Sequence, residues 1–143
     1  MYDVEGIKIV KKVAMVYGEN KIAIRYNIVN TLDEDISFQL VPFVNYRNHH
    51  EVKDAKAYSQ NYENEILTLN LDEKNCLFIK VTDSEYASYD NTFYKNMYYR
   101  VENSRGFTDT ESHFMPGQFS ITVEANSQKE IFFVAEVSDK WSV

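Results

Sequence analysis

Alternation of apolar and polar side chains is the feature that most constrains the fold of this chain. In residues 7–17 every odd position except Lys11 is apolar, and residues 22–28 alternate in the same way. A period of two places these apolar side chains on one face of a strand. The short segment between the two runs contains Gly18 and Asn20, which tolerate positive φ. The sequence therefore predicts an antiparallel hairpin here.

The alternation continues through much of the chain. Residues 36–40 alternate, and Pro42 just after them implies a bulge or an edge position, because proline cannot donate to a sheet ladder. The remaining runs predict two more hairpins, 65–71 with 76–81 and 118–124 with 130–137. No segment carries an apolar stripe of helical period over three turns. We therefore predict an all-β fold, an antiparallel β-sandwich that spans residues 1–143 as a single domain.

Two segments, residues 45–62 and 84–117, depart from the alternation. The first is polar and irregular, with room for a turn or two of helix over residues 51–62. The second contains many aromatic side chains without a regular period. Loops of this length are uncommon in compact domains and are usually functional or packed against another part. We expect both segments to be irregular and to contact a ligand or a neighbour.

The charge of the chain argues against one large class of partner. The net charge is −7, and residues 51–143 hold 16 acidic against 9 basic side chains. These acids are interspersed with other residues, which is typical of a solvated acidic face. Without a cluster of Lys and Arg there is no cationic surface for a phosphate backbone. We therefore expect no nucleic-acid partner.

The sequence also lacks the features of a membrane or secreted protein. No apolar run approaches the roughly 18–20 residues that cross a bilayer, and the N-terminus lacks the pattern of a signal peptide. We therefore expect no membrane partner. The lone cysteine, Cys76, cannot form an internal disulfide, and its apolar neighbours predict a buried, unreactive thiol. Together these features favour a cytoplasmic protein.

The densest group of polar side chains lies between residues 99 and 113. Two carboxylates there are a candidate acid–base pair for glycoside hydrolysis, which needs one protonated and one ionised carboxyl about 5–10 Å apart. The other interpretation is an irregular loop held by Arg105, which would bridge to Glu102 or Glu111. We favour the second interpretation, because loop carboxylates without a rigid frame rarely hold catalytic geometry. No catalytic residue is therefore predicted.

The histidines do not predict a metal site. His49, His50 and His113 are the three present, and adjacent residues of an extended chain point to opposite sides, which places them poorly to share a metal. A hydrogen-bonding His50 that supports the turn at Tyr46 and Arg47 is the favoured interpretation. Motifs of nucleophilic catalysis and glycine-rich phosphate loops are absent from the sequence. We predict neither a metal nor a cofactor.

Tyrosines are the first positive indication of a ligand. The chain has 11 Tyr residues, and sugar C–H faces stack on such rings while nearby carboxylates and amides accept hydroxyl protons. A glycan platform is therefore one interpretation of the tyrosines in the second aperiodic segment. The alternative, which we favour for most of them, is that they fill the core or face a neighbouring domain. The tyrosines in question are Tyr86, Tyr89, Tyr94, Tyr98 and Tyr99.

Longer motifs give the chain a family resemblance. One motif runs through Tyr99, Glu102, Arg105-Gly106, Glu111 and Pro116-Gly117-x-Phe119. The other runs upstream through Val13-x-Met15-x-Tyr17-Gly18-x-Asn20, Tyr26, Pro42-Phe43, Arg47 and His50. In this order and spacing they resemble the N-terminal domain of bacterial and archaeal-type glycogen debranching enzymes, the amylo-α-1,6-glucosidase family. The resemblance spans about residues 5–137.

The chain departs from the family pattern in two ways. Thr108 and Ser112 stand where that pattern has acidic residues, so no acidic role is carried over to them. The early Gly-rich and Arg/His-containing motifs are not found, and we expect the chain to be a fragment that begins partway into the domain. In full-length members the catalytic carboxylates lie in a following helical barrel that hydrolyses α-1,6-linked glucose. None of them is carried over to this chain.

The resemblance implies a non-catalytic module, the larger part of a supersandwich-like domain that packs on the catalytic helical barrel of the same enzyme. Its further expected partner is α-glucan, such as glycogen or a maltooligosaccharide. Loops of such a domain border the mouth of the barrel. The candidates for contact with glycan or with the barrel are Tyr46, Arg47, His50, Tyr98, Tyr99, Glu102, Arg105 and Glu111.

Two hypotheses from other classes stay open beside this one. The chain would also suit a free-standing carbohydrate-binding module, or a structural sandwich of the adhesion type. In addition, an isolated fragment would expose sheet edges and an apolar patch. We therefore expect self-association, for example as a dimer that pairs through those edges.

Overall fold

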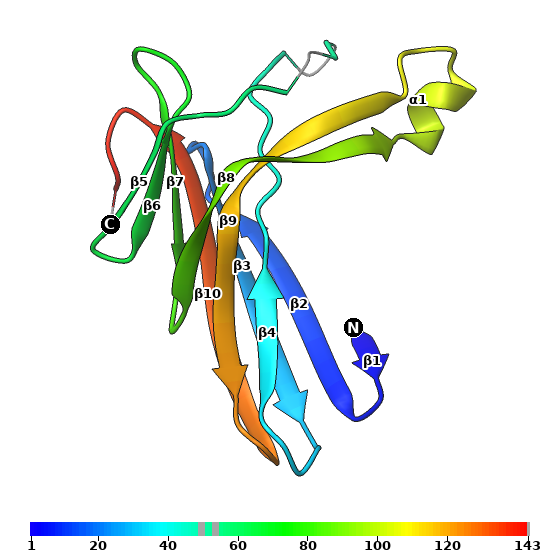
Figure 1. Cartoon of the computed structure of the whole chain (residues 1–143), viewed down its shortest axis with the longest axis vertical. Helices are drawn as coiled ribbons and strands as arrows, with labels where there is room; N and C mark the ends of the chain where they lie inside the picture. Colours follow the sequence, from blue (N-terminus) through cyan, green and yellow to red (C-terminus); the bar gives the residue numbers. More distant parts are fainter. Residues whose placement is uncertain (49–50, 53–54, 143) are drawn as a thin grey trace.

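Antiparallel strands dominate the computed structural model, which describes residues 1–48, 51–52 and 55–142 (Figure 1). The all-β prediction is confirmed. Within the described residues no helix is long and apolar enough to cross a membrane, and α1 has five residues. The elements are β1 (Tyr2–Val4), β2 (Ile7–Met15), β3 (Lys21–Asn30), β4 (Ile36–Leu40), β5 (Gln60–Glu63), β6 (Ile66–Asn70), β7 (Cys76–Val81), β8 (Glu85–Tyr98), α1 (Arg100–Ser104), β9 (Thr110–Val123) and β10 (Ser127–Ser138).

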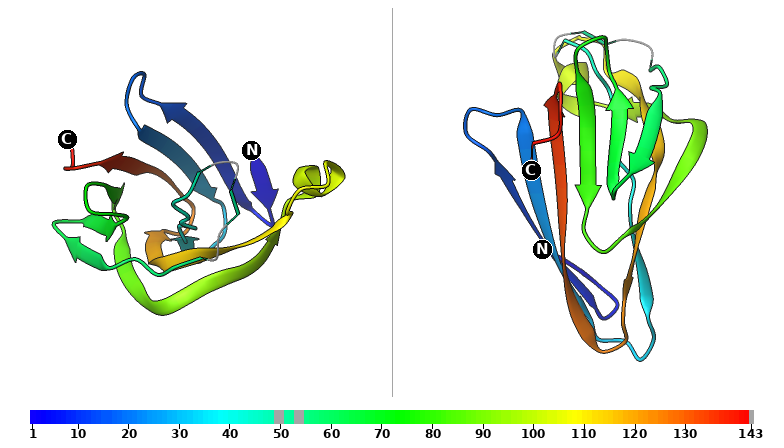
Figure 2. Two further views of the ribbon diagram at one scale, coloured as in Figure 1. Left: turned by 90° about the horizontal axis from the view of Figure 1, so that it is seen from above. Right: turned by 90° about the vertical axis from the view of Figure 1, so that its left-hand side faces the viewer.

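The strands form two sheets. Seven strands make the larger sheet in the order β1-β2-β3-β10-β7-β6-β5, and three make the smaller sheet in the order β4-β9-β8. The pairings within both sheets are antiparallel. In the right-hand view of Figure 2 the sheets converge at the bottom and spread apart toward the top. The predicted antiparallel sandwich is therefore confirmed, and it is open at one end.

Two of the three predicted hairpins are confirmed. β2 and β3 pair along their length, and Gly18 in the turn between them has φ +80°. β6 and β7 pair across a polar turn in which one carboxylate oxygen of Asp72 accepts the backbone N–H groups of Lys74 and Asn75. Both turns use residue types whose local hydrogen bonding or positive φ favours a chain reversal.

The third predicted hairpin is wrong. β9 and β10 follow one another in the chain, but β10 lies between β3 and β7 in the larger sheet, whereas β9 lies in the smaller one. Their connection crosses between the sheets, and the carboxylate of Asp35 accepts the N–H of Ala125 there. Alternation shows that a strand has one side toward the core. In a sandwich both sheets face the same core, so the pattern does not assign a partner.

Residues 84–117 are not the irregular segment that we predicted. β8 and the first half of β9 occupy most of it as a long antiparallel ladder. The ladder contains two register shifts, near which Asn91 and Asn96 adopt positive φ of 41° and 59°. A bulge adds residues to one strand and switches the face on which later side chains lie. These bulges therefore removed the alternation on which the prediction depended.

The segment between β4 and β5 matches its prediction in part. Its described residues lie outside helices and strands, except for a bridge between Val44 and Phe114. The helical turn for which the sequence left room within residues 51–62 is absent from the described part, and β5 occupies the end of that range. A bulge or an edge position was predicted at Pro42, which lies outside the strand, just after the edge strand β4.

One buried cluster runs between the two sheets, from the end where they converge to β6 and β7. β9 contributes Phe119, Ile121 and Val123, which belong to one cluster with Ile28 of β3 and Ile131 of β10. All five side chains are essentially inaccessible to solvent. Burying an apolar side chain of this size stabilises the fold by about 1.5–3 kcal/mol.

A buried asparagine joins the two sheets at the same end. The side-chain amide of Asn30 donates to the carbonyl oxygens of Glu34, Val123 and Glu124. Its side-chain oxygen accepts the N–H of Leu32. The end of β3 is thereby tied to the turn before β4 and to the end of β9, with every polar group of the amide satisfied.

Cys76 is half-buried, so the prediction of a buried thiol is wrong. The residue begins β7 beside a polar turn, and its sulfur lies 3.4 Å from the side-chain oxygen of Asn70. The apolar neighbours that suggested burial lie farther along the strand, where Phe78 and Ile79 are buried.

Candidate functional site

β8 and β9 continue past the sandwich as a two-stranded arm that ends in α1 (Figure 1). No residue of α1 is buried, and three apolar side chains near the end of the arm are exposed: Tyr98, Val101 and Phe107. Arg105 lies 3.8 Å from Glu102, which was one of its two expected partners. Both side chains are solvent-exposed, and such pairs contribute roughly 0–1 kcal/mol.

Arg47 and Glu111, which lies opposite Met97 near the outer end of the β8–β9 ladder, form a bidentate ion pair. Arg47 Nε donates to Oε1 of Glu111 at 2.5 Å, and Nη2 donates to Oε2 at 2.7 Å. The Glu111 side chain is 0% exposed. Its hydrogen bonds from Arg47 lower the pKa of Glu111, although burial acts in the opposite direction. The buried carboxylate is therefore ionised at neutral pH.

Tyr99 extends this pair into a network. Its hydroxyl lies 3.1 Å from Oε2 of Glu111 and 2.8 Å from Nε2 of His113. The hydroxyl has one proton, which the anionic carboxylate attracts more strongly than a neutral imidazole does, so Nε2–H of His113 then donates to the Tyr99 oxygen. Burial is the largest cause that raises the pKa of Tyr99, followed by its hydrogen bond to Glu111.

These four residues, Arg47, Tyr99, Glu111 and His113, are called the carboxylate cluster below. Glu111 accepts hydrogen bonds from Arg47 and Tyr99 on its two oxygens, and its pKa is lowered. A general acid in a glycosidase needs the opposite, a carboxyl with a raised pKa. What the cluster does physically is anchor the segment after β4 to β8 and β9.

Tyr46 lies apart from the carboxylate cluster. Its hydroxyl donates to Asp72 at 2.8 Å in the β6–β7 turn, and its backbone N–H donates to the hydroxyl of Tyr58. Hydrogen bonds from Asn75, Lys74 and Tyr46 lower the pKa of Asp72. Tyr46 therefore links the segment after β4 to the larger sheet.

The structure brings together Arg47, Tyr99 and Glu111 among the sequence candidates. Tyr98 is exposed beside them, whereas Glu102 and Arg105 pair with each other at α1. His50 lies outside the described residues, as does His49, so the predicted support of the turn by His50 has no structural account. Within the described part of the chain no three His, Cys, Asp or Glu side chains gather as a metal site.

The tyrosines of the proposed glycan platform separate into two groups. Tyr86 is partly buried, with its hydroxyl 2.6 Å from Oε1 of Gln60, and Tyr89 is bonded to Oε1 of Gln118 at 2.7 Å. Those two side chains and Tyr99 have packing or hydrogen-bonding roles within the fold. Tyr94 and Tyr98 are exposed and remain accessible to a ligand.

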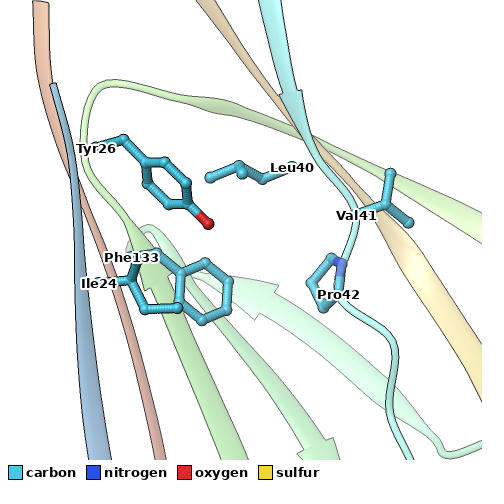
Figure 3. A pocket seen from close by; sticks show the side chains of 6 residues that line it. All are labelled: Ile24, Tyr26, Leu40, Val41, Pro42 and Phe133. Atoms are coloured by element: carbon cyan, nitrogen blue, oxygen red, sulfur yellow. The ribbon is translucent and has the colours of Figure 1, made fainter. Parts of the chain in front are cut away.

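One apolar pocket lies between the sheets (Figure 3). Its volume is about 130 Å³, well below the roughly 300–1,000 Å³ of small-molecule sites. The lining offers one hydroxyl, that of Tyr26, and is otherwise apolar. This pocket does not suit an oligosaccharide, which needs several polar partners. Its lining residues are Ile24, Tyr26, Leu40, Val41, Pro42 and Phe133.

Comparison with known families identifies the domain. A family model described as glycogen debranching enzyme N terminal matches residues 1–130. The chain belongs to this family. The resemblance drawn from the motifs is thereby confirmed. No curated protein matches the sequence.

The structure explains why this debranching-enzyme domain has glycine in its Pro116-Gly117 motif. A Cβ on Gly117 would lie 2.2 Å from the carbonyl oxygen of Ala87 and 2.7 Å from the hydroxyl of Tyr86. Contacts under 3.0 Å with backbone force a displacement, so β9 approaches β8 this closely only with glycine. Glu111 of the same motif has its own structural role in the carboxylate cluster.

His113, a member of the cluster, and its neighbour Phe43 were not predicted as site residues from the sequence. His113 was considered only for a metal, and it lies against Tyr99 and Phe43. Phe43 was part of the family motif but not of the site. Since Pro42-Phe43 lies in an apolar run, nothing in the sequence distinguished the exposed Phe43 from its buried neighbour Val44.

Proposed function

We propose that this chain is a non-catalytic N-terminal β-sandwich domain that supports the separate catalytic helical barrel of a glycogen debranching enzyme and contacts α-glucan. Family membership over residues 1–130 is the observation that carries the proposal. A cytoplasmic location is part of the proposal, argued from the lone cysteine, because small secreted domains are usually rich in disulfides.

The ionisation of the arm's carboxylates supports a non-catalytic role. Arg47 lowers the pKa of Glu111, and a hydrogen bond from Asn103 is the largest cause that lowers the pKa of Asp109. Glu102, the third carboxylate, is exposed to water and paired with Arg105. Glycoside hydrolysis needs one carboxyl that keeps its proton near neutral pH, and neither of the shifted groups moves in that direction.

The exposed end of the arm supports contact with a barrel. Tyr98, Val101 and Phe107 present apolar surface to solvent beside the paired charges of Glu102 and Arg105. Apolar side chains rimmed by polar ones are typical of surfaces that bind another protein domain. The candidates Tyr98, Glu102 and Arg105 therefore belong to the barrel-facing part of this proposal, whereas Arg47, Tyr99 and Glu111 position the arm.

Self-association of the isolated chain is a further part of the proposal. β1 pairs with Ile7–Ile9 of β2, and no pairing partner is described for the outer edge of residues 10–15. The apolar side chains of Val13 and Met15 beside this edge are 56% and 75% exposed. An open edge next to apolar surface is the usual template for pairing with a second chain.

Activity and binding assays on the purified chain test this function. We expect no glucose release from a branched α-glucan by the chain alone, and debranching when a catalytic barrel of the family is joined to it. Turnover by the chain alone would overturn the proposal. In calorimetry with maltooligosaccharides, a dissociation constant of about 1 mM or below favours the free-standing binding module instead.

A further inference from the structure

Three rings form a row on the smaller sheet, and one of them, His113, also belongs to the carboxylate cluster. Phe43 and Tyr94 are stacked, with ring centroids 4.8 Å apart and an interplanar angle of 26°. Phe43 also stacks on His113, with centroids 6.2 Å apart and an angle of 23°. We call Phe43, Tyr94 and His113 the aromatic row. Despite the stacking, Phe43 is 43% and Tyr94 46% exposed.

Strand register explains why these rings lie on one face. Tyr94 and His113 are directly opposed across the β8–β9 ladder, and the next pair along, Phe93 and Phe114, lies on the other face. Phe114 also bridges Val44, and both are buried in the core. Because successive side chains alternate across a sheet, the neighbours of this core layer point away from it. The aromatic row therefore lies on the solvent side of the smaller sheet.

The carboxylate cluster holds the row in place. His113 is bonded to the Tyr99 hydroxyl, which is bonded to Glu111, and Glu111 is fixed by two hydrogen bonds from Arg47. The His113 side chain is itself mostly buried. A ring held by such a chain of hydrogen bonds loses little conformational freedom when a ligand binds, which favours affinity.

We propose that Phe43 and Tyr94 form a stacking site for an α-1,4-linked glucan chain. This inference rests on the proposed α-glucan contact and names the residues that make it. One face of Tyr94 is covered by Phe43, and the high exposure of the ring leaves surface for the C–H face of a sugar. The Tyr94 hydroxyl supplies a donor and an acceptor for sugar hydroxyls.

Charge favours a neutral ligand over other planar or stacking ligands. A nucleobase would also stack on these rings, but its phosphates would meet a chain with a net charge of −7. An uncharged polyol carries no such penalty. The short, rigid row also suits one or two sugar units rather than the larger apolar surface that a protein partner needs.

An NMR titration of the full chain with maltoheptaose tests the inference, since it detects binding weaker than calorimetry does. We expect the backbone and ring signals around Phe43 and Tyr94 to shift progressively with sugar. We expect Phe43→Ala and Tyr94→Ala each to weaken binding by about tenfold, within the range known for ring stacking. Tyr94→Phe, which keeps the ring, should weaken it only about two- to threefold.

Tyr17→Ala is the matched control, because Tyr17 is fully exposed and far along the chain from the aromatic row. It should leave the affinity unchanged, and the dispersed spectrum of each variant shows whether its fold is intact. If maltoheptaose binds the parent chain and the two alanine variants equally well, the inference is overturned while the proposed glucan contact stands. If the parent chain shows no shifts at millimolar sugar, the glucan contact itself fails.

Discussion

The two ends of the sandwich differ sharply. At the end where the sheets converge, Phe119, Ile121 and Val123 are buried and Asn30 ties the sheets together. At the other end the sheets diverge (Figure 2). Val13 and Met15, in the part of β2 that β1 does not cover, are exposed there. The core continues toward this end on the side of β6 and β7, where Leu67, Leu69 and Ile79 are buried. It is the end of β2 that lacks a covering layer, although its alternation is as regular as that of the buried strands.

This difference suggests a division of roles. The converged end contributes to the stability of the domain, because apolar surface is removed from water there. The open end and the arm carry the exposed apolar side chains that suit contacts with other domains or ligands. The predictions below test whether stability and binding separate in this way.

The largest effect is expected from a cavity at the converged end. Phe119 is 0% exposed, and Phe119→Ala should lower the free energy of unfolding by about 3–5 kcal/mol. Met15→Ala at the open end should change it by no more than about 0.5 kcal/mol. Urea denaturation of both variants measures the contrast. Equal losses would show that the open end is as important to stability as the converged end.

The next largest effect concerns the two ion pairs of the arm. Glu111→Gln leaves the Arg47 guanidinium without its carboxylate and should destabilise the fold by about 3 kcal/mol. Glu102→Gln removes the exposed pair with Arg105 and should cost under about 1 kcal/mol. Unfolding by urea at neutral pH compares them. If Glu111→Gln were as stable as the parent chain, the arm would not be anchored by this pair.

A somewhat smaller loss is expected from Asn30→Ala. The substitution leaves three backbone carbonyls without the amide donor that they share, which should destabilise the fold by about 2 kcal/mol. Asn61→Ala, at an exposed amide in β5, is the control and should be nearly neutral. Thermal unfolding monitored by circular dichroism distinguishes the two. Matching melting temperatures would argue against a bridging role for Asn30.

At acidic pH the parent chain and Glu111→Gln should differ less in their free energy of unfolding than at neutral pH. The pKa of Glu111 is lowered from its usual 4.5, so the unfolded chain takes up this proton more readily than the folded one. The stability that this group contributes is therefore present above pH 4.5 and is lost as the pH falls through the lower folded value. The urea midpoints of the two proteins should differ at neutral pH, and the difference should shrink as the pH falls below 4.5. A constant gap would contradict the argument.

The smallest effect on the fold is expected from a charge on the open edge. Val13→Lys should leave stability almost unchanged but weaken self-association by on the order of tenfold, because edge lysines oppose strand pairing. Val101→Lys, at the end of the arm, is the control for non-specific solubility. Light scattering over a range of concentrations measures both. A parent chain that stays monomeric at high concentration would rule out edge pairing.

Much of the fold was predictable where local chemistry decides it. The β2–β3 and β6–β7 hairpins combine alternation with a turn that contains Gly18 or Asp72, so neighbours in sequence are partners in space. The β9–β10 hairpin failed because sheet membership depends on distant strands. β8 was missed because the bulges near Asn91 and Asn96 break the period that identifies a strand.

The site was predictable in its residues but not in its contacts. Arg47, Tyr99 and Glu111 were candidates through the family motifs, yet Arg47 and Glu111 lie 64 positions apart. Arg105 was the nearer cation in sequence and pairs with Glu102 instead. Phe43 escaped notice because exposure depends on a single bridge, Val44 to Phe114, that no local pattern encodes.

The place of β10 governs when this domain can form. β10 is the last strand in the described part of the chain, yet it lies in the middle of the larger sheet and separates β1-β2-β3 from β7-β6-β5. Until it inserts, a nascent chain leaving the ribosome holds two half-sheets with unpaired edges, a state that is prone to aggregation. A truncated chain that ends at residue 130, where the family match ends, would lack most of this strand. The twelve residues of β10 therefore complete the larger sheet, because they join its two halves.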